Sequence, residues 1–174
     1  MRISCLLLSA LVFFCCSCDQ QPPKQVQPSS DRQIKESLER ANRYLVNDEE
    51  EEIENYVRRH QLEMIATGTG LRYQIVNKGK DSLIRQGQTV TMDYVLYDLM
   101  GDVVYSSEMQ GPMKVLVGRS EKVTGLDEAL RYLHEGDCAW VIVPSHLGYG
   151  LLGDQDAIPS RATLIYYLKI TKVE

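Results

Sequence analysis

The sequence predicts an α+β domain: a curved antiparallel sheet of about five or six strands wrapped on one short helix, with an N-terminal helical segment before it. Three observations predict this class. From residue 61 onward, β-branched and aromatic runs with alternating polarity are separated by turns that contain glycine. In that part, residues 125–133 show the spacing of an apolar helix face. The chain has 174 residues, 44% hydrophobic and 25% charged, which fits one globular domain with additional segments.

An apolar run begins the chain and ends at a cysteine. Arg2 precedes residues 5–16, which are too few to span a bilayer and have the pattern of a secretory signal peptide. A small residue, Ser17, stands directly before Cys18, the arrangement at which bacterial lipoprotein signals are cleaved and acylated. We therefore expect residues 1–17 to be a lipoprotein signal peptide and Cys18 to carry the lipid. The alternative is a plain secretory signal followed by a cysteine without lipid.

The stretch that begins at Cys18 has the composition of a tether. Residues 18–30 are rich in Pro, Gln and Ser and hold almost nothing that a core would bury, so we expect an extended, disordered segment. If Cys18 is acylated, Cys138 is the one other cysteine of the mature chain, and no internal disulfide is expected. The formal net charge is −5 and no basic stripe appears, which argues against a nucleic-acid partner.

Residues 31–60 predict a helical segment made of two helices, near 31–46 and 48–60. Asn47 and Glu50 match a capping box, and the acids that surround them favour a solvated helix start. Each helix has only a thin apolar stripe, so neither is expected to be stable alone. They need a partner surface, which is the main domain, the other helix, or a second copy of the chain in a homodimer.

Residues 61–174 predict the sheet domain. Gly125 begins the one short helix, and alternation along the strand that holds Trp140 puts this side chain on the outer face of the sheet. There we expect the N-terminal helices to cover it. The runs that predict strands are residues 62–67 and 71–76, which flank a glycine turn, and then 89–99, 103–107, 113–118, 138–143 and 162–170.

The loop before the last strand is long and irregular. Tyr149 stands between two glycines, where few neighbours can bury it, and Ile158-Pro159 leads into the strand. The three histidines of the chain have no spacing typical of metal ligands. Ser145 is followed by a histidine, but no nucleophile elbow surrounds it. Neither a metal site nor a nucleophile therefore accounts for the loop.

The order of motifs in the second half of the chain resembles that of a known family. The motifs are "VTGL" entering the helix, "LHEGD" leaving it, then "VPSHLGYG" and "IPSRATL". Together, residues 71–174 resemble the FKBP family of peptidyl-prolyl isomerases. The helical stretch before them, with "ANRYLV" and "IENYVRRH", is similar to gliding-motility-associated lipoprotein isomerases of the Bacteroidetes.

The resemblance implies an apolar cleft beside the short helix that receives a proline and needs no metal or cofactor. The Tyr149 hydroxyl and the Val123 backbone N–H would each hold a substrate carbonyl, and Ile158 would close one side. The glycines beside Tyr149 would aim its ring at the cleft. The residues implied as the lining are Tyr94, Tyr105, Met113, Val123, Leu126, Tyr149, Ile158 and Tyr166.

Such a cleft would accelerate rotation of an X-Pro bond, whose barrier is about 18–20 kcal/mol because resonance stiffens the amide. An apolar site disfavours the charge-separated planar amide more than the twisted one, which is differential stabilisation of the transition state. We therefore expect a lipid-anchored prolyl isomerase that faces the periplasm or the cell exterior. Its partners would be exported polypeptides that contain X-Pro bonds.

Three positions depart from the family pattern. Ser106 follows Tyr105 where an acid is usual, Leu126 replaces the usual Trp of the floor, and Met113 replaces another aromatic residue. Each change removes a charge or a rigid aromatic wall. An alternative is therefore a catalytically weak FKBP-fold module that binds Pro-containing peptides or acts as a chaperone. A third interpretation is a domain that only builds an assembly through its helices.

Overall fold

The computed structural model describes residues 31–80, 82–119 and 123–174. The expected signal peptide and tether, with Cys18, lie outside the described residues. The chain divides into two compact units, residues 1–38 and residues 39–174, and the second unit holds the whole sheet.

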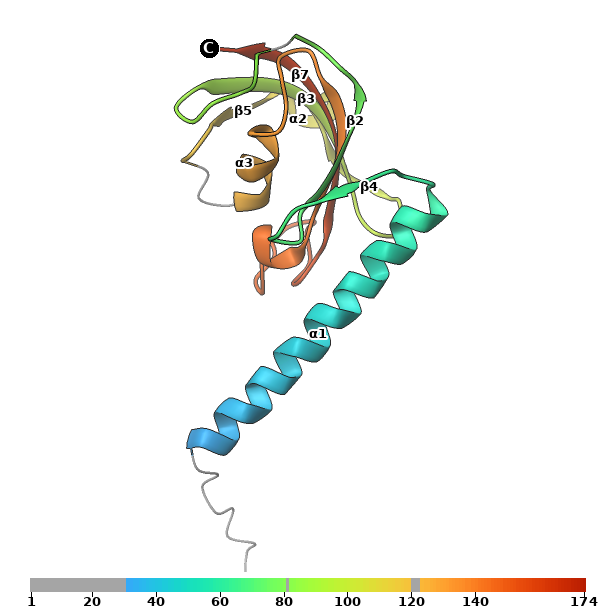
Figure 1. The fold of residues 1–174 in the computed structure, drawn as a ribbon, viewed down its shortest axis with the longest axis vertical. Helices are drawn as coiled ribbons and strands as arrows, with labels where there is room; N and C mark the ends of the chain where they lie inside the picture. The colour runs from blue at the N-terminus through green and yellow to red at the C-terminus, as the bar shows by residue number, and fades with distance from the viewer. Residues whose placement is uncertain (1–30, 81, 120–122) are drawn as a thin grey trace, which may run out of the picture. The chain divides into compact units, whose positions relative to one another are not determined.

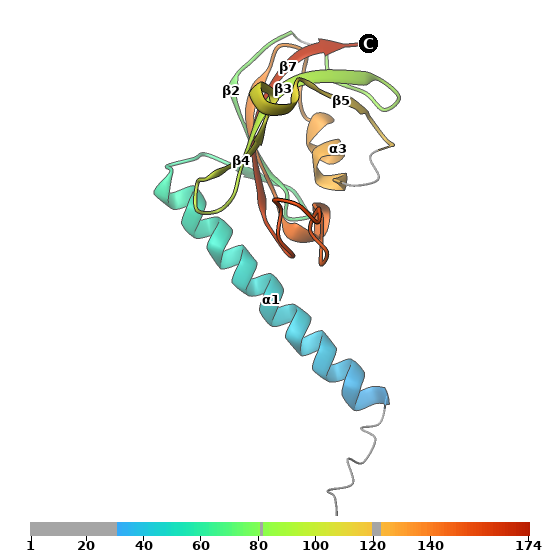
Figure 2. The same ribbon diagram turned by 180° about the vertical axis from the view of Figure 1, so that it is seen from behind.

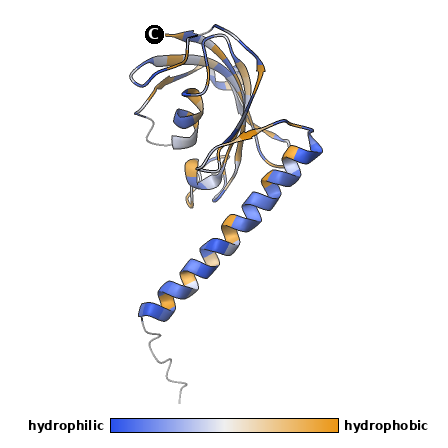
Figure 3. Ribbon diagram, viewed as in Figure 1, coloured by the Kyte–Doolittle hydropathy of each residue, from blue (hydrophilic) through white to orange (hydrophobic). Residues whose placement is uncertain are grey.

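One long helix, α1 (Asp31–Arg59), replaces the two helices that the sequence predicts. The expected break at Asn47 was wrong, because Asn47 lies inside the helix. No glycine or proline interrupts this stretch, and glutamate is a good helix former, so the acidic run continues the helix. The residues of α1 are largely hydrophilic, with hydrophobic ones at intervals along the helix (Figure 3). In the described part of the chain, no helix combines the length and apolar content that a bilayer crossing requires.

The C-terminal part of α1 packs on the outer face of the sheet. Ile53 and Tyr56 are buried there against Ile142 and Ile165, and Trp140 packs at the edge of the same cluster. The prediction that Trp140 lies on the outer face of the sheet is confirmed, and the end of α1 packs on that same face. The thin apolar stripe of residues 48–60 has its partner surface within the domain.

An ion-pair cluster also joins α1 to the sheet. The Arg72 side chain is 5% exposed and pairs with Glu54 at 2.7 Å and with Glu50. A buried guanidinium without a carboxylate would be costly, so these acids are structural partners of the sheet. The expectation that the acidic run is only a solvated helix start was wrong, because the sequence does not show that a buried arginine lies opposite it.

The sheet is antiparallel throughout the described residues, with seven strands in the order β1-β2-β6-β7-β3-β4 and β5 also paired with β3. The sheet curves, and α3 lies on its concave side (Figure 1), as the reverse view also shows (Figure 2). The predicted fold class is confirmed. The elements are β1 (Ile65–Ala66), β2 (Arg72–Asn77), β3 (Thr89–Tyr97), β4 (Val103–Ser106), α2 (Ser107–Gln110), β5 (Met113–Leu116), α3 (Thr124–Leu130), β6 (Cys138–Val143), η1 (Ser145–Leu147) and β7 (Leu164–Val173).

The main core lies between the sheet and α3. Leu126, Ala129 and Leu130 of α3 are buried, and burial alternates residue by residue along β3, as the sequence pattern predicts. The same hydrophobic cluster continues from the core to the residues beside the long loop. The fold therefore places an apolar surface below the irregular segment that precedes β7.

Candidate active site

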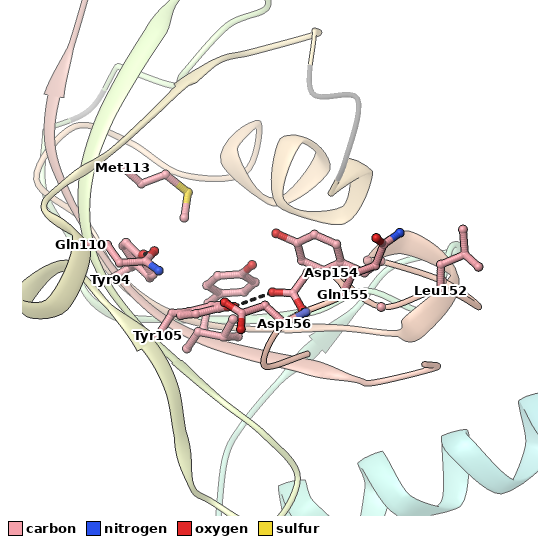
Figure 4. Close-up of a pocket in the computed structure, with 14 residues that line it drawn as sticks. Tyr94, Tyr105, Gln110, Met113, Leu152, Asp154, Gln155 and Asp156 are labelled. Carbon is pink, nitrogen blue, oxygen red and sulfur yellow. Dashed lines mark hydrogen bonds between the residues drawn. The ribbon is translucent and has the colours of Figure 1, made fainter. Parts of the chain in front are cut away.

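A cleft of about 730 Å³ opens between the sheet and the loop after η1. Tyr94, Gln110 and Met113 lie at one end of it, and Leu152 and Gln155 lie at the other (Figure 4). The sheet and α2 thus provide one wall and the loop provides the other. The described residues that line it are Tyr94, Leu96, Tyr105, Gln110, Met113, Gly148, Tyr149, Gly150, Leu152, Gly153, Asp154, Gln155, Asp156 and Tyr166.

Five of the eight predicted site residues line this cleft, and the structure brings all eight into one hydrophobic cluster. Val123, Leu126 and Ile158 are not in the lining; they are 6%, 3% and 2% exposed and belong to the buried part of the cluster. Because these three side chains are closely covered by neighbours, they shape the cleft from behind its surface. The five in the lining are Tyr94, Tyr105, Met113, Tyr149 and Tyr166.

Hydrogen bonds hold the start of the loop in shape. The Ser145 carbonyl accepts from the N–H groups of Gly148 at 3.1 Å and Gly150 at 2.9 Å, one on each side of Tyr149. The Arg161 N–H donates to the Gly150 carbonyl at 2.8 Å and so ties the start of the loop to its end. Backbone hydrogen bonds therefore define the conformation of the loop segment that carries Tyr149.

The second half of the loop folds back on itself around Gly153. Asp154 and Ile158 exchange two hydrogen bonds: the Asp154 N–H reaches the Ile158 carbonyl at 3.1 Å, and the Ile158 N–H reaches Asp154 Oδ1 at 2.8 Å. Gly153 has a φ of 64°, and a Cβ there would stand 2.1 Å from the Ile158 carbonyl oxygen. Gln155 also has a left-handed φ, 67°, which is costly for a residue with a side chain. Only glycine fits at position 153.

Comparison with known proteins identifies the domain. A sequence model of the FKBP-type peptidyl-prolyl cis-trans isomerase family matches residues 80–171. This chain belongs to the FKBP-type family. The match covers the cleft, the loop and α3, so the predicted enzyme family is confirmed.

Relatives share parts of this FKBP-type chain. It is 32% identical over 107 residues to the probable FKBP-type isomerase FkpA of Neisseria meningitidis serogroup B, covering 62% of this chain and 39% of that one. It is 28% identical over 152 residues to chloroplastic FKBP20-2 of Arabidopsis thaliana, covering 83% and 60%. The chain thus spans 39% and 60% of these two relatives. The crystal structure of Escherichia coli FkpA has the same fold, with a TM-score of 0.63, 23% identity, and coverage of 85% of this chain and 75% of that one.

Three polar partners of the tyrosines in this FKBP-type cleft were missed by sequence reasoning. The Tyr105 hydroxyl donates to Asp154 Oδ2 at 2.6 Å and lies 3.2 Å from Asp156 Oδ2, while the Tyr94 hydroxyl donates to Gln110 at 2.9 Å. An acid therefore stands beside Tyr105, although Ser106 occupies the position where the family usually has one. The sequence signal was present in the Asp-x-Asp of the loop, which is typical of side chains that bond to nearby backbone.

Ser106 has a structural role instead. Its hydroxyl accepts from the Met109 N–H at 3.3 Å and caps the short helix α2. That helix ends at Gln110, whose side chain meets Tyr94 in the cleft. The serine thus positions a cleft residue without contributing a charge.

The phenols of the cleft are protonated at neutral pH. The hydrogen bond to Asp154 raises the pKa of Tyr105 to about 12. Burial raises the pKa of Tyr94, Tyr149 and Tyr166 above the ordinary value of 10.0. Desolvation alone would raise the pKa of Asp154, but hydrogen bonds from Tyr105 and from three backbone N–H groups outweigh it and lower the pKa below 3.8. The cleft therefore presents neutral hydroxyl groups beside the ionised carboxylate of Asp154.

Proposed function

We propose that this chain is a peptidyl-prolyl cis-trans isomerase that acts on X-Pro bonds of exported polypeptides. The proposal is based on the cleft itself. It lies in an FKBP-type domain, below the hydrogen-bonded loop that carries Tyr149, and four tyrosines and a methionine are among the residues that line it. Among the described lining residues there is no histidine, lysine, cysteine or arginine. Such a cleft suits a reaction that makes and breaks no covalent bond and needs only a change in amide geometry.

The proposed mechanism is desolvation with orientation. The proline ring enters the cleft against Met113 and the tyrosine rings, which exclude water from the X-Pro amide. A planar amide loses more favourable solvation there than a twisted one, because its charge separation is larger. Tyr149, which lines the cleft and is partly exposed, donates its hydroxyl to a substrate carbonyl.

A second candidate function is a module that binds Pro-containing peptides with weak catalysis. The observation that favours it is the missing aromatic floor: Leu126 is 3% exposed and absent from the lining, and Met113 is a flexible wall. Both functions use the same cleft. An isomerisation assay on X-Pro peptides separates them, because a binding module would bind the peptide without accelerating exchange.

The proposed mechanism predicts a flat pH profile. The four cleft tyrosines have raised pKa values and stay protonated below 10, and Asp154 has a lowered pKa and stays ionised above 3.8. None of these five groups changes charge between those limits, so kcat/KM should vary less than about twofold from about pH 5 to about pH 9. The measurement is isomerisation of one uncharged X-Pro peptide across that range. A bell-shaped profile would show general acid–base catalysis and contradict the mechanism.

We further propose that the protein is a lipoprotein of the cell envelope. The apolar run over residues 1–17, the Ser17-Cys18 junction and the Pro- and Gln-rich residues 18–30 support a cleaved signal, a lipid anchor and a tether. The helical stretch from residue 31, with its similarity to gliding-motility-associated lipoprotein isomerases of the Bacteroidetes, supports the same placement. The tether would let the FKBP-type domain reach polypeptides that emerge beyond the membrane, on the periplasmic or exterior side.

Cys18→Ser should release the protein from membranes. The thiol is the one group at the processing site that accepts the lipid, and serine removes it with little change in size. The measurement is the fraction of protein in the membrane pellet after cell lysis, with Cys138→Ser as the matched control that keeps the anchor. Equal pelleting of Cys18→Ser and wild type would show that the lipid is not the anchor.

We also propose that residues 31–60 support a homodimer. Ile34 and Leu38 are 45% and 59% exposed on α1, so this end of the stripe offers apolar surface to a second copy. Light scattering of the chain from residue 19 onward, at several concentrations, should show a mass near twice that of the monomer. Ile34→Glu with Leu38→Glu should return it to the monomer. A wild-type chain that is monomeric at all concentrations would rule the dimer out.

A further inference from the structure

We infer that Glu49 of α1 is a positioning residue for the loop that carries Tyr149, so that α1 forms part of the active-site support. The inference deepens the proposed isomerase function and rests on it for its catalytic consequence. It assigns to the helix a role within the domain that does not depend on the membrane anchor or on a second copy of the chain.

The carboxylate of Glu49 accepts three hydrogen bonds from two buried residues. Oε1 accepts from the Ser145 N–H at 2.6 Å and from the Thr163 hydroxyl at 2.7 Å, and Oε2 accepts from the Ser145 hydroxyl at 2.9 Å. Ser145 and Thr163 are 6% and 3% exposed. Hydrogen bonds to an ionised carboxylate are about twice as strong as neutral ones.

The two partners stand at opposite ends of the loop. Ser145 opens η1 at its start, and Thr163 directly precedes β7 at its end. One side chain of α1 therefore ties both ends of the loop together. A second contact reaches the same end, since Arg161 donates from its side chain to the Leu45 carbonyl of α1 at 3.2 Å.

The path from Glu49 to Tyr149 is short. The Ser145 carbonyl accepts from the N–H groups of Gly148 and Gly150, which flank Tyr149. Fixing the Ser145 amide by the carboxylate fixes the orientation of that peptide segment, and with it the turn on which the tyrosine stands. A catalytic donor must be held within about 0.5 Å of its productive position, so such support has a catalytic effect.

The carboxylate is itself held by a docked helix. Ile53 and Tyr56, one and two turns further along α1, are buried against the sheet, and Glu54 pairs with Arg72. These contacts dock α1 without touching the loop. They provide a matched control, because Glu54→Gln removes the same charge from the same helix while Glu50 still pairs with Arg72.

The first test is amide hydrogen exchange measured on the full chain, which does not depend on catalysis. Glu49→Gln removes the charge that strengthens these hydrogen bonds and replaces one of the two acceptor oxygens by an amide nitrogen. We expect the Gly148 and Gly150 amides to exchange about tenfold faster than in wild type, and those of Glu54→Gln to exchange as in wild type. Ser145→Ala, which removes one of the three hydrogen bonds and leaves α1 unchanged, should give an intermediate rate.

The second test is a double-mutant cycle on X-Pro isomerisation. Glu49→Gln should lower kcat/KM about fivefold in wild type and less than about twofold in a Tyr149→Ala background, because the carboxylate acts through the tyrosine. A general loss of stability would cost the same factor in both backgrounds and would overturn the inference. Unchanged exchange at Gly148 and Gly150 in Glu49→Gln would overturn it as well. A wild-type chain without isomerase activity would refute the proposed function instead, and the exchange data would still decide the role of Glu49.

Discussion

Replacing Ile158, which lies behind the cleft lining, by Asp should lower kcat/KM for X-Pro isomerisation by at least about a hundredfold, the largest effect expected of any single change at the site. Ile158 is 2% exposed and belongs to the cluster that holds Tyr94 and Tyr166. A carboxylate at this point would draw water to the place where the mechanism requires an apolar surface. It would also cost at least about 2–5 kcal/mol of stability, the range for removing a buried isoleucine side chain.

Matched variants separate the loss of activity from the loss of stability. Ile158→Val and Ile158→Thr have the same shape and differ by one hydroxyl, so both should fold, with Val costing about 0.5–1.5 kcal/mol. The expected order of kcat/KM is wild type, Val, Thr, Asp. For comparison, Tyr149→Phe removes one hydrogen bond worth about 0.5–1.5 kcal/mol and should cost up to about tenfold. Wild-type rates in folded Thr and Asp variants would show that the apolar character of the cleft has no role.

Gly153→Ala should have the second largest effect, lowering kcat/KM about tenfold to a hundredfold and stability by about 1–3 kcal/mol. The new Cβ would stand 2.1 Å from the Ile158 carbonyl oxygen and 2.9 Å from the Pro159 carbonyl carbon. Both obstacles are backbone, so the loop itself must move. That movement breaks the paired hydrogen bonds between Asp154 and Ile158 and shifts the wall of the cleft.

Gly150→Ala is the control for backbone strain. Gly150 has a similar φ, 61°, but a Cβ there has nothing within 4 Å. The substitution should therefore cost only the left-handed strain of about 1–2 kcal/mol and leave kcat/KM within about threefold of wild type. Thermal melts and isomerase rates of Gly150→Ala and Gly153→Ala separate the effect of backbone strain from that of the steric contact. Equal effects at the two positions would show that strain, and not the contact with Ile158, explains the glycine at 153.

The sheet and its apolar faces were predictable because each depends on residues close in the sequence. Alternation over residues 89–97 defines β3, and the glycine turn before residue 71 defines the first hairpin. The helix boundary at Asn47 was not predictable, because a capping pattern inside a stretch of good helix formers competes with simple continuation. The continued helix also places Glu50 and Glu54 opposite the buried Arg72, and no local pattern shows that partner.

The residues of the candidate site also divide into those that the sequence predicts and those that only the structure shows. The resemblance to the FKBP family supplied the residues that stand on its motifs, and five of them line the cleft. It did not supply the partners that arrive from elsewhere: Asp154 meets Tyr105 from 49 positions away, and Glu49 meets Ser145 from 96 positions away. Such contacts depend on tertiary packing, so only the structure reveals them.

The most direct test of the central claim is the rate of cis–trans exchange of an X-Pro peptide, followed by NMR exchange or by a protease-coupled assay, with and without the wild-type chain. The uncatalysed bond exchanges over tens to hundreds of seconds at 25 °C, so acceleration is readily seen. If the cleft below the Tyr149 loop is an isomerase site, catalytic amounts of the chain will accelerate exchange and the same amounts of Ile158→Asp will not. A folded wild-type chain that binds the peptide and leaves its exchange rate unchanged would contradict the claim and leave the binding module in its place.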